Sequence, residues 1–251
     1  GAFERDKMLA GLPAAFIYFQ TSGDLHYSAL PVDMDGNMPP PVGAPGIIAE
    51  FQDKTWIGTA NDQVWLTDLH VDWANPAAST FGVGATHDPN YAIDITDVSA
   101  NCSGRDCVPQ GPSAQKVDDI DFRLMHRAAY RNLGSSHAIV ASMTVGAGGR
   151  AGVWWGEFQN TGTGWTNRQD GVYAPADGDH RWMPSIAMDT NGNIMLGYSA
   201  SSTTIYPSVR YTGRLAGDPL GQMGDEKVLV VGAGAQSGGN RWGDYSMMTI
   251  D

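Results

Sequence analysis

The chain contains 251 residues, of which 42% are hydrophobic and only 17% are charged, and its formal net charge is −12. This length fits one large all-β domain or two small domains. No cluster of lysine and arginine offers the basic surface that nucleic acid or an anionic membrane requires, so we expect neither partner. The apolar runs, such as residues 228–231, have the length of strands and are too short for membrane insertion.

The N-terminal half alternates short apolar segments with turn-forming residues. A helix-like piece is expected at 6–11, and a long proline-rich loop contains Asp33–Asn37 and Pro39–Pro41. Residues 75–115 are predicted to form a long irregular excursion. Strands are expected at 14–20, 46–51 and 63–73.

Cys102 and Cys107 lie in this excursion among turn-forming residues. Free cysteines prefer buried apolar sites, so a disulfide that closes the small loop is the favoured interpretation. A disulfide indicates an extracellular location, either secreted or at the cell surface. A pair of metal-binding thiols would need two further soft ligands, and no other Cys or His lies close in the sequence.

From residue 122 onward the pattern becomes regular, with apolar runs separated by turn signals. Eight strands are predicted in two groups of four. The first group is 122–132, 138–145, 152–158 and 164–173, and the second is 182–189, 193–199, 208–214 and 227–231.

An Arg-Trp pair that opens an apolar strand occurs at Arg181 and again at Arg241, with a weaker copy at Arg127. The three arginines are 54 and 60 residues apart (127 to 181 and 181 to 241). This period suits a four-stranded propeller blade, which takes roughly 40–50 residues. The sequence therefore predicts one all-β propeller domain over residues 1–251, with four to five blades' worth of chain. Both ends break off within the pattern, as in a fragment or a processed chain.

Three segments, 179–189, 210–219 and 241–246, resemble a family of large secreted bacterial β-propeller proteins, and residues 4–11 are similar to it as well. That family is largely uncharacterised and is broadly similar to sialidase-type propellers with Asp-box-like turns. The resemblance implies a fold and an extracellular compartment more than an activity.

The repeated arginines are the first candidate binding site. In a propeller, Arg127, Arg181 and Arg241 would converge on the central channel, where guanidinium groups bind a carboxylate or a sulfate. Alternatively, each arginine pairs with a neighbouring aspartate, such as Asp179 or Asp244, and fastens one blade to the next. The residues that would line such a site beside the arginines are His126, His180, Trp182 and Trp242.

Carboxylates and a phenol give a weaker hypothesis of catalysis by a carbohydrate-active enzyme. Glycoside hydrolysis uses two carboxylates that flank one bond, and a sialidase-like mechanism uses a tyrosine with an acid. The candidates are Asp244, Tyr245 and Glu157, with Asp170 as a further acid.

Two oxygen-rich turns could hold calcium, which takes six to eight oxygen ligands. One is formed by Asp189, Asn191 and Asn193, and the other by Asp33–Asn37. The same pattern is common in hairpin turns, and no cofactor is required by the sequence.

Taken together, these patterns predict an extracellular binding or scaffold module that recognises carbohydrate or protein at a channel mouth. The alternatives are a sialidase-like hydrolase or polysaccharide lyase, and a purely structural part of a larger cell-surface protein.

Overall fold

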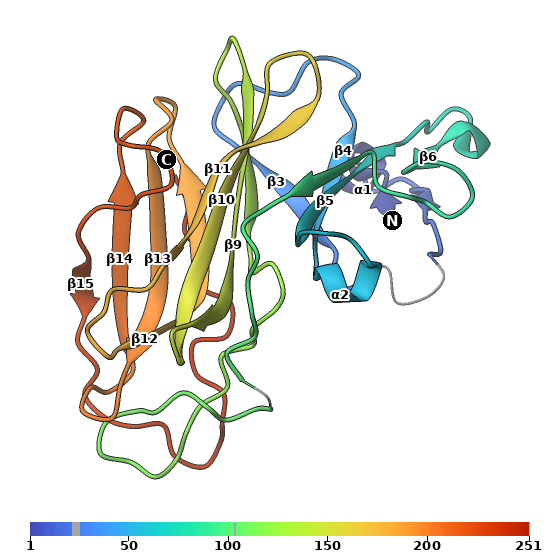
Figure 1. Cartoon of the computed structure of the whole chain (residues 1–251). Coiled ribbons are helices and arrows are strands. Elements are labelled where there is room, and N and C mark those ends of the chain that lie inside the picture. Colours follow the sequence, from blue (N-terminus) through green and yellow to red (C-terminus); the bar gives the residue numbers. More distant parts are fainter. Residues whose placement is uncertain (22–25, 103, 251) are drawn as a thin grey trace.

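The computed structural model describes residues 1–21, 26–102 and 104–250, and it is mostly β, with 41% strand and 5% helix. Three sheets account for the strands (Figure 1). The helices are short: α1 (Arg5–Leu9), α2 (Lys54–Ile57) and the 3-10 turn η1 (Pro76–Ala78). Among the described residues, no helix is long and apolar enough to cross a membrane. The all-β prediction is confirmed.

The largest sheet has nine strands in the order β11-β10-β9-β8-β3-β4-β5-β6, with β7 also paired to β5. Strand β3 joins its two halves, because it runs parallel to β8 along residues 32–35 and antiparallel to β4 at residues 30–31. The strands from the first half of the chain are β3 (Leu30–Asp35), β4 (Gly46–Gln52), β5 (Gln63–His70), β6 (Thr80–Phe81) and β7 (Tyr91–Asp94). Those from the second half are β8 (Ala128–Asn132), β9 (His137–Ala147), β10 (Arg150–Asn160) and β11 (Trp165–Tyr173).

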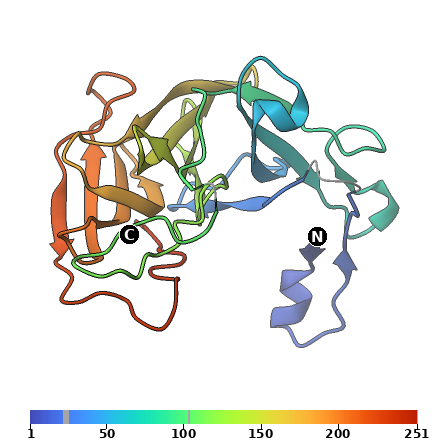
Figure 2. The same cartoon turned by 60° about the horizontal axis from the view of Figure 1, so that its bottom comes forward.

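This sheet curls into a half-barrel, so that β7 approaches β11 at the far edge (Figures 1 and 2). The side chain of Asn167 donates to the carbonyl of Asp94 at 3.2 Å, and the amide of Thr96 donates to Asp170 at 2.7 Å. One apolar core fills the curl. Its largest fully buried members are Phe51, Leu66, Ile139, Met143, Trp154 and Phe158.

The second sheet is a four-stranded antiparallel meander that packs against the outside of the half-barrel (Figure 1). Its strands, in sheet order, are β12 (His180–Met188), β13 (Ile194–Ser201), β14 (Ser208–Arg214) and β15 (Lys227–Val230). Val140 and Trp155 of the half-barrel meet Ile186 and Leu196 in this second core. A third, separate sheet pairs only β1 (Ala2–Phe3) with β2 (Phe16–Ile17).

The alternation of side chains along β9 and β10 explains why both strands are buried and mostly apolar in their central parts. Successive side chains of a strand point to opposite faces. Ile139 and Trp154 therefore enter the core of the half-barrel, whereas Val140 and Trp155 enter the core shared with the second sheet. Because both faces are covered, neither strand shows the apolar and polar alternation of a half-exposed sheet.

The prediction of two consecutive four-stranded antiparallel groups is confirmed by the pairing of β8–β11 and β12–β15. The prediction of a propeller is not borne out in its full form, because the described chain does not close into a ring of four-stranded blades. Instead, β3 inserts beside β8 and fuses the first group with the N-terminal strands. Arg181 lies on β12 as expected, Arg127 directly precedes β8, and Arg241 lies outside any strand.

The turn after β3 places Gly36 against a buried arginine. Gly36 has φ +81°, and a Cβ added there would lie 1.9 Å from the guanidinium of Arg131. Arg131 in turn donates from Nε and a terminal nitrogen to the carbonyl of Met188 at 2.9 and 2.7 Å, which ties the half-barrel to β12.

We predict that Gly36→Ala lowers the free energy of unfolding by about 1–3 kcal/mol more than Gly43→Ala. Both glycines have φ near +80°, so both variants carry the left-handed penalty, but a Cβ at Gly43 meets nothing within 4 Å. Only Gly36→Ala displaces Arg131 from Met188. Urea denaturation measures both variants, and equal losses would contradict the account.

Candidate functional site

A cleft of about 440 Å³ opens at one mouth of the half-barrel. Its walls come from the same end of successive strands, because Ile47 pairs with Asp68, and Asn160 pairs with both His137 and Trp165. The mouths of curled and closed sheets are frequent sites of ligand binding. The lining residues are Val32, Met34, Pro40, Pro41, Ala44, Pro45, Gly46, Ile47, Asp68, Tyr91, Tyr130, His137, Asn160, Gly162, Gly164 and Trp165.

Aromatic side chains form the floor of this mouth cleft. The hydroxyl of Tyr130 and Nδ1 of His137 are 2.7 Å apart, and their rings stack with centroids 5.8 Å apart. Trp165 meets Tyr130 edge to face at 6.4 Å. Tyr91 is only partly buried and packs on the same core. Burial raises the pKa of Tyr130 above its usual value, so this hydroxyl stays protonated and can donate.

Two polar groups stand among these rings. The carboxyl group of Asp68 has no hydrogen bond or ion pair with another described residue, and burial raises its pKa above the usual value. Oδ1 of Asn160 accepts from the amides of Gly162 and Gly164 at 2.8 and 3.3 Å, which fixes the side chain in place. The carboxyl of Asp68 and the amide nitrogen of Asn160 are therefore available to a ligand.

The rim opposite the aromatic floor is built by the proline-rich loop. Pro40, Pro41 and Pro45 line the cleft, and Asn132 donates to the carbonyl of Pro39 at 2.8 Å, which ties the loop to β8. Proline fixes φ, so such a rim loses little conformational entropy when a ligand binds. The sequence predicted this loop but gave no signal that it faces Tyr130 and Trp165.

No protein-family model matches the chain, and no curated protein or solved structure is similar enough to it to count as a match. The resemblance to secreted bacterial propellers therefore remains a prediction, and the function must be argued from the geometry.

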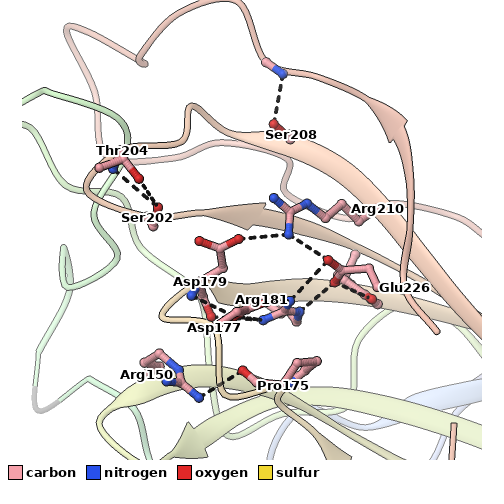
Figure 3. A network of polar contacts seen from close by, with 12 residues as sticks. Arg150, Pro175, Asp177, Asp179, Arg181, Ser202, Thr204, Ser208, Arg210 and Glu226 are labelled. Atoms are coloured by element: carbon pink, nitrogen blue, oxygen red, sulfur yellow. Dashed lines mark hydrogen bonds and ion pairs between the residues drawn. The ribbon is translucent and has the colours of Figure 1, made fainter. Parts of the chain in front are cut away.

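Arg181 lies at the centre of a buried ionic network (Figure 3). Its guanidinium binds Asp177 at 2.6 Å and Glu226 at 2.7 Å, and it is 1% exposed. Arg210 binds Asp179 at 2.9 Å and the same Glu226 at 2.7 Å, and Tyr198 also donates to Glu226. Figure 3 shows both guanidinium groups pointing at Glu226. These contacts favour the fastening role over an anion clamp.

The network sets the ionisation of its members. The hydrogen bond from Arg181 lowers the pKa of Asp177 to about 2. Burial acts to raise the pKa of Glu226, but hydrogen bonds from Arg181 and Tyr198 outweigh it and lower that pKa. Burial likewise acts against the charge of Arg181, and its carboxylate partners more than compensate and raise its pKa. All three groups are thus charged at neutral pH.

The other two repeat arginines have separate carboxylate partners. Arg127 is buried and pairs with Asp33 and Asp35 at the end of β3. Arg241 is 44% exposed and pairs with Asp244 at 2.5 Å and with the buried Asp118 at 3.5 Å. No contact among Arg127, Arg181 and Arg241 is found within the described ranges, so the structure does not bring the three together as one clamp.

Of the residues predicted to line the clamp, His180 and Trp182 make internal contacts, whereas Trp242 lines a separate cleft of about 570 Å³ together with Asp244 and Tyr245. Nδ1 of His180 accepts from the amide of Ala151 at 3.1 Å, which joins β12 to β10. Trp182 is fully buried, and its ring lies 6.2 Å from that of Trp242. His126 is half-buried beside Arg127. None of them lines the mouth cleft.

Of the predicted catalytic residues, Asp244 and Tyr245 line one cleft, and Glu157 and Asp170 lie outside it. Glu157 is buried and binds Arg168 at 2.8 Å as well as Gln169. Asp244 pairs with Arg241, and Tyr245 is exposed next to it. Asp170 accepts from Trp154 and Thr96. Each acid therefore has a structural partner, and no contact joins Glu157 to Asp244 or Tyr245 among the described residues.

The turns considered for calcium are already internally bonded. Asp189 accepts from the amides of Asn191 and Asn193 at 2.8 and 2.9 Å and from the side chain of Asn193 at 2.8 Å. Asp33 and Asp35 are paired with Arg127. A cation at either turn would have to displace these contacts, so calcium stays an untested prediction with no support from the geometry.

We predict that Arg181→Ala lowers the free energy of unfolding by about 3–5 kcal/mol, because it removes a buried guanidinium from Asp177 and leaves Glu226 with Arg210 as its cationic partner. The matched variant Arg241→Ala removes a half-exposed pair and should lose no more than about 1 kcal/mol. Chemical denaturation of both variants measures the difference. A stable Arg181→Ala variant that loses affinity for an acidic saccharide would instead restore the clamp.

Half-buried His180 makes stability depend on pH in a defined window. Burial, followed by the charge of Arg150, lowers its pKa to about 4, whereas an unfolded histidine titrates near 6.5. Between these values the unfolded chain binds the proton more readily, so the contribution of His180 is complete above pH ~6.5 and is lost as the pH falls towards ~4.

We therefore expect the stability difference between the wild type and His180→Asn to shrink as the pH falls through this window. Buried acids with raised pKa values act in the opposite direction but are common to both proteins, so the difference isolates His180. Melting temperatures at several pH values provide the measurement, and a pH-independent difference would refute the assignment.

Proposed function

We propose that the chain is a binding module that takes a neutral carbohydrate in the mouth cleft. The observation that carries this proposal is the combination of an aromatic floor with the unpaired carboxyl of Asp68 and the fixed amide of Asn160. Sugars present apolar C–H faces together with hydroxyl groups. Rings therefore bind the faces, and carboxyl and amide groups bind the hydroxyls.

Charge favours a neutral ligand over an acidic one. The chain carries a formal net charge of −12, and among the described residues that line the cleft the only carboxyl group is that of Asp68. None of the described lining residues is Lys or Arg, and the repeat arginines are bound to carboxylates elsewhere. An acidic saccharide would meet repulsion here without a compensating guanidinium.

The same lining favours binding over hydrolysis. A glycosidase generally needs two carboxyl groups that face each other across one bond, at roughly 5–10 Å. Among the described lining residues only Asp68 carries one. The carbohydrate-active enzyme is therefore the weaker alternative. A purely structural role in a larger assembly is the other alternative. The internal pairing of the arginines agrees with that role, but a structural role does not explain the cleft.

The proposal also includes a relation of the fold to propellers and an extracellular location. The meanders β8–β11 and β12–β15 correspond to two consecutive propeller-type blades, modified by the insertion of β3. The Cys102–Cys107 disulfide is compatible with an extracellular location, where carbohydrate ligands are abundant.

Binding to an array of neutral oligosaccharides, followed by calorimetry, tests the proposal. We expect Tyr91→Ala to weaken binding about tenfold, since a ring contact contributes roughly 0.5–1.5 kcal/mol. Asp68→Asn should weaken it by a similar or larger factor, because hydrogen bonds to charged groups contribute about 1.5–3 kcal/mol. Tyr18→Ala is the control, since Tyr18 is 67% exposed and lies outside the cleft.

Two results would contradict the proposal. One is the absence of binding to any neutral saccharide on the array. The other is saccharide binding that Tyr91→Ala and Asp68→Asn leave unchanged, because the ligand would then occupy a different surface.

A further inference from the structure

The loop of Cys102 and Cys107 packs against an acidic segment that the sequence did not connect with it. The amides of Asn101 and Cys102 donate to Asp121 at 2.6 and 3.1 Å. Beyond the loop, Val108 and Val117 exchange backbone hydrogen bonds of 3.0 and 2.9 Å. These hydrogen bonds, in addition to the covalent disulfide, therefore hold both cysteines beside this segment.

This packing brings a third ligand group to the two sulfurs. The Sγ of Cys102 lies 3.3 Å from Oδ1 of Asp119, and the Sγ of Cys107 lies 4.0 Å from Oδ2. One ligand atom from each residue can be chosen so that all lie within 4.8 Å of one another. In a tetrahedral zinc site, bonds of about 2.0–2.3 Å put neighbouring ligand atoms about 3.6 Å apart. The distances from each sulfur to the carboxylate of Asp119 are therefore close to the spacing that such a site requires, whereas the two sulfurs, bonded to each other here, must move apart after reduction.

The surroundings of Asp119 suit a cation. Asp119 is fully buried, and no Lys, Arg or His among the described residues pairs with it. Asp118 and Asp121 lie close by in the sequence, and both line an adjoining cavity of about 300 Å³. Asn101 donates to Asp119 at 2.7 Å and to Cys107 at 2.9 Å, as outer groups that orient metal ligands do. Cys102 also lines the cavity, which gives space for a water ligand, and the same lining contains Arg105, Arg123 and Arg241.

We infer that, once the disulfide is reduced, Cys102, Cys107 and Asp119 form a binding site for a thiophilic divalent cation of the zinc class. A phosphine reduces the disulfide to two thiols and is itself oxidised to the phosphine oxide, with water as the source of oxygen and of the two protons. The cation then displaces the two thiol protons. Thiolate ligands select zinc-like ions over calcium. Disulfide and metal are thus mutually exclusive states of one pair.

Cobalt(II) titration of the phosphine-reduced full chain tests this inference. We expect one equivalent of Co²⁺ to bind with a thiolate-to-cobalt charge-transfer band, which Zn²⁺ removes and Ca²⁺ does not. The oxidised chain should show no band, and Cys102→Ser should abolish it in the reduced chain. Asp119→Asn should weaken Co²⁺ binding tenfold or more. The matched control Asp106→Asn removes the same charge from the same loop and should bind as the wild type does.

Circular dichroism of each reduced variant checks that the sheets are intact. Failure of the reduced wild type to bind Co²⁺ would overturn the inference. Binding by Asp119→Asn as tight as by Asp106→Asn would also overturn it, because the cysteines would then act without the carboxylate. Saccharide binding at the mouth cleft is a separate measurement, so either proposal can fail alone.

Discussion

Strands β9 and β10 form a wall that is apolar on both faces, and the two main sheets depend on it. One face closes the core of the half-barrel through Ile139 and Trp154, and the other closes the core against β12 and β13 through Val140 and Trp155. A change in register by one residue would exchange these two sets of side chains. The wall also fixes the mouth cleft, because His137 begins β9 and Asn160 ends β10.

Buried ion pairs then hold the strands of the second sheet, β12–β15, in register. Arg181 and Arg210 converge on Glu226 between β12, β14 and the segment before β15. Arg131 fastens β8 to β12, and Arg127 fastens β3 to the residue before β8 within the half-barrel. Loss of one partner leaves a buried charge unpaired, which destabilises the fold by more than the intact pair stabilises it. These arginines therefore disfavour other packings of the two sheets. Their engagement with carboxylates is one reason why we propose the mouth cleft, and not the arginines, as the ligand site.

The sequence predicted the C-terminal half well and the site poorly, for physical reasons. Strands such as β10 and β14 are continuous apolar or alternating runs, and β14 was predicted with its observed bounds, Ser208–Arg214. Strand β3 was missed because its run Leu30–Asp35 contains a proline and two aspartates, and its parallel pairing with β8 is a long-range contact that no local pattern encodes. For the same reason the contacts of Asp119 with the cysteines, and the presence of Tyr91 and Trp165 in one cleft, could not be foreseen.

The central claim is that the mouth of the half-barrel is the ligand site. Titration of the isotope-labelled chain with a neutral oligosaccharide, followed through the indole N–H signals, tests it most directly. The account predicts that the signal of Trp165 shifts in a saturable way, whereas those of buried Trp182 and of Trp242, outside the cleft, stay in place. Shifts confined to Trp182 and Trp242, or no shift for any signal, would contradict it.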